Sequence, residues 1–425
     1  MSRAMYRGLL LGAVGGAILL AAAAPASAKL LPLSERTYGV LLSDRDRNQI
    51  LLTRDLNGDG DATDPGEVKA YFDQTNQSGL PAPVGDGLTI FQASDRAIYV
   101  GDGQTDTVYR LFDKNRDGDA NDPGEARIFF SGTGGAGSGN ASSLMLPTPN
   151  GIGEDADGNL YLVNAGTASL PFDGIYKLRD LNGDGDANDA GESAVWQDFT
   201  PPWPAASPFE IAVVDGVVYT IDTNGGQPDA IWRSRDINDD GDANDFGLGE
   251  AGTLLAEPNA FGVPLGFAMG AGEKGLYVMH ETATGATTGQ VFRLNDLDGS
   301  GTIDSAAEAI LVWAETQLPV GFVFDVGFAL DVGPGDSLML SLNSGSAGGK
   351  ILVYLVDLNR DGDYMDAGET RIWGTAQSQG GFISTVRTAE FIAAAPEPVT
   401  AGLLGLGLAG AIVAYRRQGR PAAGG

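Results

Sequence analysis

The 425-residue chain contains no cysteine and a single histidine, His280. The absence of cysteine excludes disulfide bonds, thiolate catalysis and cysteine-ligated zinc. One histidine is too few for histidine-rich metal motifs such as HExxH. Stability must therefore come from packing, to which a metal bound by oxygen ligands can add.

Basic residues are also scarce, with 26 Lys and Arg against 56 Asp and Glu and a formal net charge of -30. This balance argues against electrostatic binding of nucleic acid or of anionic lipid. Thirty of the acidic residues fall within six short segments. The acidity therefore belongs mainly to a set of candidate sites and not to an evenly charged surface.

These six segments are copies of one acidic loop, and we number the loops 1 to 6 and the residues of each loop from its first Asp. The copies are DLNGDGDATDPGE from Asp55, DKNRDGDANDPGE from Asp113, DLNGDGDANDAGE from Asp180, DINDDGDANDFGLGE from Asp236, DLDGSGTIDSAAE from Asp296 and DLNRDGDYMDAGE from Asp357. Their starts are 56 to 67 residues apart. A period of about 60 residues indicates a repeat architecture.

Each loop has the donor set of a calcium site. Oxygen-bearing side chains occupy positions 1, 3 and 5, a glycine at position 6 permits a sharp turn, and most copies add a carboxylate at position 7. Calcium takes six to eight oxygen ligands in flexible geometry, whereas magnesium demands a tighter octahedron and retains its waters, so calcium is favoured. Without a cation, five clustered carboxylates would repel one another and destabilise the fold. The alternative is a set of solvated acidic turns without metal.

The predicted metal ligands follow this pattern, with a later acid at position 10 (position 9 in loop 5), and whether this acid or the late Glu completes the shell is left open. They are Asp55, Asn57, Asp59, Asp61, Asp64 and Glu67; Asp113, Asn115, Asp117, Asp119, Asp122 and Glu125; Asp180, Asn182, Asp184, Asp186, Asp189 and Glu192; Asp236, Asn238, Asp240, Asp242, Asp245 and Glu250; Asp296, Asp298, Ser300, Asp304 and Glu308; and Asp357, Asn359, Asp361, Asp363, Asp366 and Glu369.

The DxNxDG start of these loops resembles the calcium loops of EF-hand and dockerin proteins. The resemblance implies up to about six bound Ca²⁺ ions with EF-like coordination in the first half of each loop. The late Glu stands at position 13 (position 15 in loop 4) and not 12, and no amphipathic helix follows it. Loop 5 has Ser300 at position 5 and Thr302 at position 7, so we expect it to bind most weakly.

Short apolar and β-branched segments flank every loop. A strand-like segment precedes each loop, another follows it, and two more lie upstream, so each repeat has four strands, A to D, with the acidic loop joining C to D. Six such units predict an all-β, six-bladed β-propeller over residues 29–394. The first repeat lacks strand A, and residues 388–394 are expected to supply it and close the ring. An open β-solenoid or a row of small modules is the alternative.

In antiparallel blades the C–D turns share one face, so we expect all six loops on that face, towards the outer rim. Trp196, Trp203, Trp232, Trp313 and Trp373 lie mainly on predicted C or D strands. We therefore expect them in the core between blades and not as platforms for stacking sugars.

The N-terminus has the features of a secretory signal peptide. Arg3 and Arg7 precede an apolar run, and Ala26 and Ala28 flank Ser27 in a small-x-small cleavage site, which predicts a signal over residues 1–28. An uncleaved membrane anchor is the alternative.

At the C-terminus, Pro396, Glu397 and Pro398 precede an apolar run over residues 399–415 and the basic pair Arg416 and Arg417. Such a run is long enough to form a transmembrane helix. Residues 395–425 resemble the PEP-CTERM sorting signal of Gram-negative bacteria. The resemblance implies recognition by an exosortase-type protease, display at the cell surface or release, and an association with exopolysaccharide. A plain tail anchor is the alternative.

The sequence thus predicts a secreted calcium-binding propeller that acts as a binding or structural module, with extracellular polysaccharide or another surface protein as its partner and membrane contact only through its ends. A calcium-dependent hydrolase of the lactonase or phytase kind is the alternative, for which the channel-facing candidates are Asp102 and Asp222, just after B strands. A third reading is an acidic calcium reservoir with no specific ligand.

Overall fold

The structure, a computed structural model, describes residues 38–44, 47–81, 87–135, 137–166, 173–199, 207–223, 228–266, 268–279, 289–344, 349–376 and 386–393. All of them belong to the compact unit Leu31–Gly425. The predicted signal peptide, the predicted sorting signal, Trp203 and His280 lie outside these residues. Within the described ranges, no helix is long and apolar enough to cross a membrane.

The described residues form six antiparallel sheets of four strands each, which are the six predicted blades. Blade 1 consists, from the channel outwards, of β24 (Val386–Ala393), β1 (Tyr38–Asp44), β2 (Gln49–Thr53) and β3 (Val68–Phe72). Blade 2 comprises β4 (Gly87–Gln92), β5 (Ile98–Asp102), β6 (Thr107–Leu111) and β7 (Ala126–Ser131). Blade 3 comprises β8 (Pro149–Glu154), β9 (Leu160–Asn164), β10 (Gly174–Leu178) and β11 (Ser193–Asp198).

The remaining blades follow the same order. Blade 4 comprises β12 (Pro208–Val214), β13 (Val217–Asp222), β14 (Ala230–Ser234) and β15 (Ala251–Ala256). Blade 5 comprises β16 (Ala268–Gly272), β17 (Gly275–Met279), β18 (Gln290–Leu294) and β19 (Ala309–Ala314). Blade 6 comprises β20 (Val326–Val332), β21 (Leu338–Ser344), β22 (Gly349–Leu355) and β23 (Thr370–Thr375). In the part of the chain that the structure describes, three single-turn 3-10 helices lie between strands: η2 (Phe246–Leu248), η3 (Glu315–Gln317) and η4 (Pro334–Asp336).

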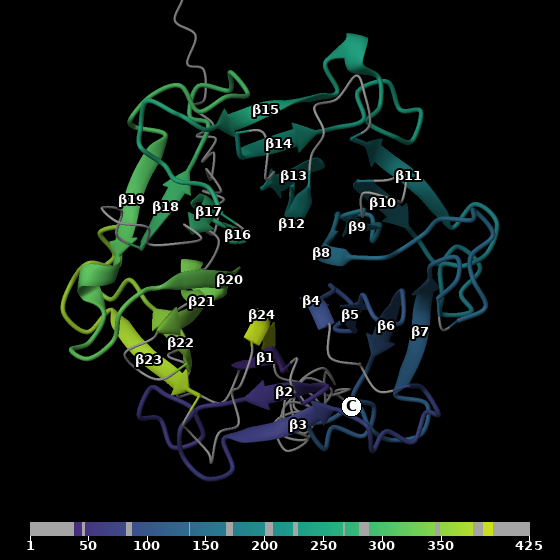
Figure 1. Cartoon of the computed structure of the whole chain (residues 1–425), viewed down its shortest axis with the longest axis horizontal. Coiled ribbons are helices and arrows are strands. Elements are labelled where there is room, and N and C mark those ends of the chain that lie inside the picture. The colour runs from purple at the N-terminus through teal and green to yellow at the C-terminus, as the bar shows by residue number, and fades with distance from the viewer. Residues whose placement is uncertain are drawn as a thin grey trace, which may run out of the picture. The chain divides into compact units, whose positions relative to one another are not determined.

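The ring closes as the sequence predicted. The last strand, β24, pairs antiparallel with the first, β1, and becomes the innermost strand of blade 1. The innermost strands then contact one another in succession around the channel, from β4 to β24 and back to β4 (Figure 1). This closure removes the free sheet edge that an open solenoid would present.

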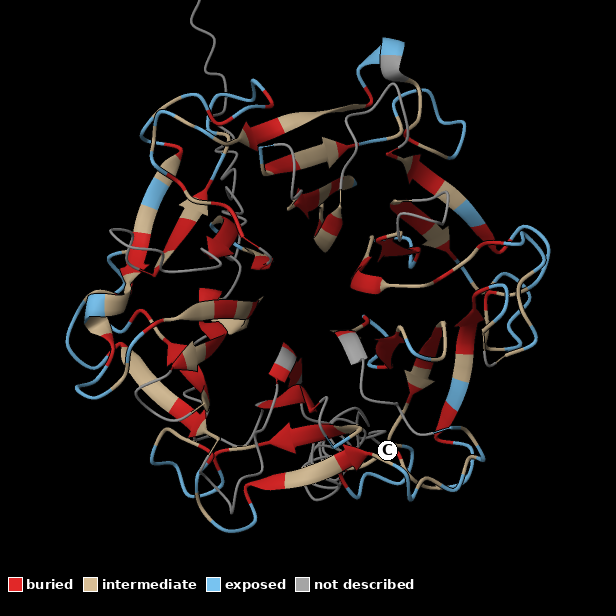
Figure 2. Ribbon diagram, viewed as in Figure 1, coloured by how far each residue is buried: buried red, intermediate tan, exposed pale blue. Residues whose placement is uncertain are grey.

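The core lies between the blades, where their apolar faces pack (Figure 2). Trp196, Trp313 and Trp373 on the outer strands are buried, and each indole N–H donates to a hydroxyl of the next blade. Trp232 is half-buried. The predicted placement of tryptophans between blades is therefore confirmed for the three on outer strands.

Candidate functional site

Each acidic loop joins the third and fourth strands of its blade, as predicted, and lies at the outer edge of the ring (Figures 1 and 2). The backbone N–H of the residue before position 1 donates to the carbonyl of the late Glu, as from Arg54 to Glu67 at 2.8 Å in loop 1. A register shift in the two outer strands accompanies every loop. The same closed hairpin therefore recurs six times.

The first and last acids of each loop hold its backbone. In loop 1 the Asp55 carboxylate accepts the N–H groups of Gly58 (2.6 Å) and Gly60 (2.8 Å). Glu67 accepts the N–H of Leu56 at 2.8 Å on one oxygen and that of Asp64 at 2.9 Å on the other. The late Glu is buried in all six loops. These two side chains therefore shape the loop from within.

The side chains at positions 3, 5 and 10 converge. In loop 1 the amide nitrogen of Asn57 donates to the carboxylates of Asp59 (3.0 Å) and Asp64. The same pair of contacts is made by Asn115, Asn182, Asn238 and Asn359. An amide can turn to exchange its nitrogen for its oxygen. The partly positive N–H thus stands between two carboxylates, where a cation is favoured. The position 7 acid is not part of this group: Asp61 accepts the N–H of Thr63.

Loop 5 departs from this arrangement because Asp298 replaces the Asn at position 3. Among the described residues, Asp296, Asp298 and Glu308 are the one trio whose acidic oxygens lie within 4.8 Å of one another. The nearby Asp298 carboxylate is the main cause that raises the pKa of Asp304. Hydrogen bonds, first from the Asp304 N–H, lower the pKa of Glu308 to about 2. In this loop three carboxylates therefore meet with no Asn side chain among them.

Two loops contain an orphaned oxygen that tests whether a cation fits. The Oδ1 atoms of Asp236 and Asp357, both at position 1, are buried and have no hydrogen-bond partner. A buried carboxylate oxygen without a partner is costly. A calcium ion would provide the missing contact, so the donor set fits calcium.

Position 8 connects each loop to the preceding blade, a role that the sequence analysis missed. The N–H of Ala187 in loop 3 donates to the carbonyl of Phe129 on β7 at 2.7 Å. Ala62, Ala120, Ala243, Ile303 and Tyr364 make the equivalent bond in the other loops, and all six side chains are buried. A recurring small or apolar residue inside an acidic loop was the available sequence signal. The loops are therefore connections between blades as well as candidate metal sites.

Basic side chains from the preceding blade reach several of the loops. Lys69 donates to the carbonyl of Asp117 at 2.7 Å and pairs with the carboxylate of Asp119 at 3.2 Å. Arg127 and Arg293 donate to the carbonyls of Asp184 and Gly362. These contacts offset part of the loop charge across the same blade boundary.

Enlarging the position 8 side chain should loosen this boundary. For Ala187→Leu we expect a loss of about 1–3 kcal/mol in the free energy of unfolding, because a buried, close-packed site must accept a larger side chain. Urea denaturation measures it. The matched control is Ala141→Leu at an exposed residue, which should change stability by less than about 0.5 kcal/mol. Equal effects of the two variants would contradict a close-packed boundary.

Asp102 and Asp222, the expected channel-facing acids, do not line the channel cavity, which corrects that expectation. Both are buried. Asp102 accepts the N–H of Gln104 and the hydroxyl of Thr105, and Asp222 accepts the N–H of Ser207 and the indole N–H of Trp232. They fix the ends of the second strands and are not available to a ligand.

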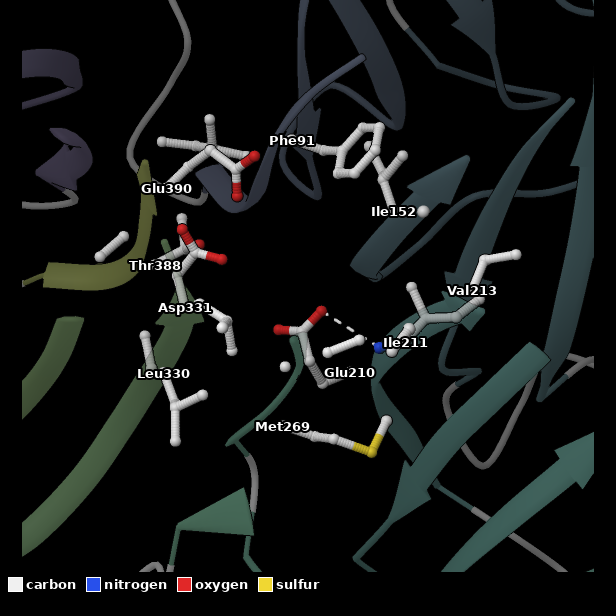
Figure 3. A pocket seen from close by; sticks show the side chains of 18 of the residues that line it. Phe91, Ile152, Glu210, Ile211, Val213, Met269, Leu330, Asp331, Thr388 and Glu390 are labelled. Atoms are coloured by element: carbon white, nitrogen blue, oxygen red, sulfur yellow. Dashed lines mark hydrogen bonds between the residues drawn. The ribbon is translucent and has the colours of Figure 1, made fainter. Parts of the chain in front are cut away.

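The channel contains a different set of acids. A cavity of about 240 Å³ lies among the innermost strands, and Glu210 (β12), Asp331 (β20) and Glu390 (β24) contribute to its wall. Figure 3 shows their carboxyl groups directed into this cavity. The sequence analysis missed them. The available signal was an acid inside an apolar strand-length segment, as in PFEIAVV, where acidic residues are uncommon.

Burial dominates the electrostatics of this channel cluster. It raises the pKa of Glu210 to about 8 and that of Asp331 to about 6, and it raises the pKa of Glu390 well above its usual value. Repulsion from Asp331 adds to the shift at Glu210 and Glu390. Near neutral pH the cluster therefore holds protons that isolated carboxylates would have lost.

No protein-family model matches the chain, and no curated protein matches its sequence. Solved structures do resemble it. A chain of a nidogen–laminin complex has 14% identity, covering 84% of this chain and 99% of that chain, with a TM-score of 0.48. Virginiamycin B lyase from Staphylococcus aureus has 16% identity over 80% and 84%, with a TM-score of 0.41.

A gluconolactonase from Xanthomonas campestris has 13% identity, covering 79% of this chain and 84% of that chain, with a TM-score of 0.38. At identities and TM-scores this low, these likenesses carry no argument about activity.

Proposed function

We propose that the chain is a secreted, surface-sorted, calcium-binding propeller that acts as a non-enzymatic binding or structural module. The observation that carries the proposal is a backbone hydrogen bond that recurs in all six loops. In each loop the N–H of position 8 donates to a carbonyl of the preceding blade. Because each candidate calcium loop is attached to two blades, a cation that orders the loop also orders the boundary between them. Calcium binding then becomes part of the folding free energy.

In this proposal the side chains at positions 1, 3, 5 and 10 supply most of the calcium ligands. The convergence of positions 3, 5 and 10 supports the position 10 acid as a ligand, because both oxygens of the late Glu already accept backbone N–H groups. The orphaned oxygens of Asp236 and Asp357 support position 1. A bound calcium ion would supply charge neutralisation and cross-linking of the loop.

Calcium stoichiometry tests the proposal. We expect about six ions per full chain in isothermal titration, with loop 5 filling last because it has fewer carboxylate charges than the other loops. Asp64→Asn should remove or weaken one site and leave the others. Fewer than two bound ions would contradict the proposal. Weak, equivalent sites whose loss leaves the fold unchanged would favour the calcium reservoir instead.

Surface sorting and an association with extracellular polysaccharide belong to the same proposal and rest on the two ends of the sequence. Fractionation of cells that express the chain with and without residues 395–425 would test sorting by an exosortase-type protease. A glycan array in the presence of calcium would test the polysaccharide partner, and the absence of any bound glycan would count against it.

A hydrolase with its active site in the channel is the second candidate. The convergence of Glu210, Asp331 and Glu390 in one cavity favours it, because carboxyl groups with raised pKa values are suited to acid–base catalysis. Assays of the chain against panels of lactones and phosphate esters test for hydrolase activity. Turnover that Glu210→Gln abolishes would support this candidate over a purely structural role.

A further inference from the structure

The channel cavity has an acidic lining with no positive counterpart. Glu154 contributes a fourth acid, and the described residues that line the cavity include no Lys, Arg or His. Both oxygens of Glu154 accept hydrogen bonds from Ser94, at 2.7 Å from its N–H and 3.1 Å from its hydroxyl. The other three acids are therefore the groups left to meet a ligand.

Neighbouring strands hold two of these three carboxyl groups. Glu390 Oε1 accepts the N–H of Gln92 at 2.8 Å, and Asp331 Oδ2 accepts the N–H of Phe391 at 2.6 Å. Glu210 Oε1 accepts only the N–H of its own neighbour Ile211, at 3.1 Å. The Oε2 atoms of Glu210 and Glu390 accept no hydrogen bond from the described chain, and both residues are half-buried. These free oxygens are directed into the cavity (Figure 3).

The three acids are spread around the channel wall, on β12, β20 and β24. Their acidic oxygens do not all lie within 4.8 Å of one another; in the described ranges the loop 5 trio meets that condition. A ligand with more than one positive centre therefore suits this arrangement.

Much of the remaining wall is apolar, and a second hollow adjoins the cavity. Ile152, Ile211, Met269 and Leu330 form part of the wall, which suits a hydrocarbon segment. The cavity shares Val213, Ala271 and Val332 with the adjoining hollow, which has a volume of about 570 Å³. The adjoining hollow contains Glu273 and Asp336 and, among its described residues, no basic side chain. Both hollows therefore favour a cation.

We propose that the channel binds a small aliphatic di- or polyamine, with its ammonium groups on Glu210, Asp331 and Glu390 and its methylene chain against the apolar wall. Ammonium groups bring the positive charge that the enclosed carboxylates lack. Binding favours the ionised carboxylates, so it releases protons near neutral pH. The site is separate from the rim loops, and the inference does not depend on calcium.

Four of the six inner strands contribute a titratable group to the cavity wall. The groups are Glu154 on β8, Glu210 on β12, Asp331 on β20 and Glu390 on β24, with Glu273 and Asp336 in the adjoining hollow; β4 and β16 contribute none to the described lining. All of them are acids, so affinity for an amine should rise between pH 6 and pH 8 as they ionise.

Isothermal titration of the calcium-saturated full chain tests the proposal, with 1,4-diaminobutane as the probe. We expect one binding event per chain, at least tenfold tighter at pH 8 than at pH 6, and no binding of the neutral isostere 1,4-butanediol. Glu210→Gln and Glu390→Gln should each weaken binding at least tenfold. Both variants remove a repelling charge, so they should fold, which circular dichroism verifies.

The matched control is Asp239→Asn, which removes one negative charge from an exposed position of loop 4. It should leave the affinity within twofold of the parent chain. Equal losses in the control and channel variants would show general attraction to an acidic protein and would overturn the proposal. So would binding of the diol, or calcium that displaces the diamine from the channel.

Discussion

Removal of calcium with EGTA is expected to lower the melting temperature of the full chain by at least about 15 °C. Thirty carboxylates crowd into six loops, and each loop is bonded to two blades. A site held at 100 times its dissociation constant adds about 2.7 kcal/mol, so six sites add about 16 kcal/mol. Differential scanning calorimetry measures the shift.

Simple charge screening is the competing explanation for such a shift, and it has its own control. Sodium chloride screens loop charges without filling the loops. We expect sodium chloride at matched ionic strength, and magnesium at matched concentration, to restore only a small part of the lost melting temperature. If sodium chloride restored all of it, or if EGTA changed nothing, the loops would be acidic turns and not calcium sites.

Replacement of Glu210 by Gln is expected to stabilise the fold at high pH. The folded pKa of Glu210 is about 8 against an ordinary 4.5, so the folded state binds the proton more tightly than the unfolded state. The stability of the parent chain therefore falls as pH rises from 4.5 through 8. Since one pKa unit corresponds to about 1.4 kcal/mol, the variant gains at most about 5 kcal/mol above pH 8.

Glu210 is only half-buried, so solvent screening lowers the expected gain to about 2–4 kcal/mol. Urea denaturation at pH 5 and pH 9, in saturating calcium, measures it, and the difference should be close to zero at pH 5. Glu154→Gln is the matched control because both Glu154 oxygens are already hydrogen-bonded to Ser94. A gain of equal size in the control, or a gain that does not depend on pH, would contradict a raised pKa at Glu210.

The blade count, the ring closure and the position of the acidic loops were predictable from the sequence. They depend on local features that recur every 60 residues or so, namely strand-length apolar segments and an acidic hairpin of 13 residues, or 15 in loop 4. The missing first strand of repeat 1 and the spare strand near residues 388–394 were enough to predict the β24–β1 pairing. A single apolar segment is a weak indication of a strand, but the same order of segments in six repeats is a strong one.

The interior of the loops was predictable only in part. The convergence of Asn57, Asp59 and Asp64 follows from their spacing, but the use of both Glu67 oxygens on backbone N–H groups does not. Hairpin closure decides which way that side chain turns. The prediction that Asp102 and Asp222 face the channel was wrong for a similar reason. Their carboxylates accept hydrogen bonds from the turns beside them.

The sequence by itself therefore determined the repeat, the strand order and the acidic loops, because these arise from contacts between residues near one another in the chain. Only the tertiary structure decided the bond from Ala187 to Phe129 and the meeting of Glu210, Asp331 and Glu390. These groups lie some 60 to 180 residues apart in the chain. Their proximity depends on how neighbouring blades pack side by side, and no pattern within one repeat shows which side chains then meet.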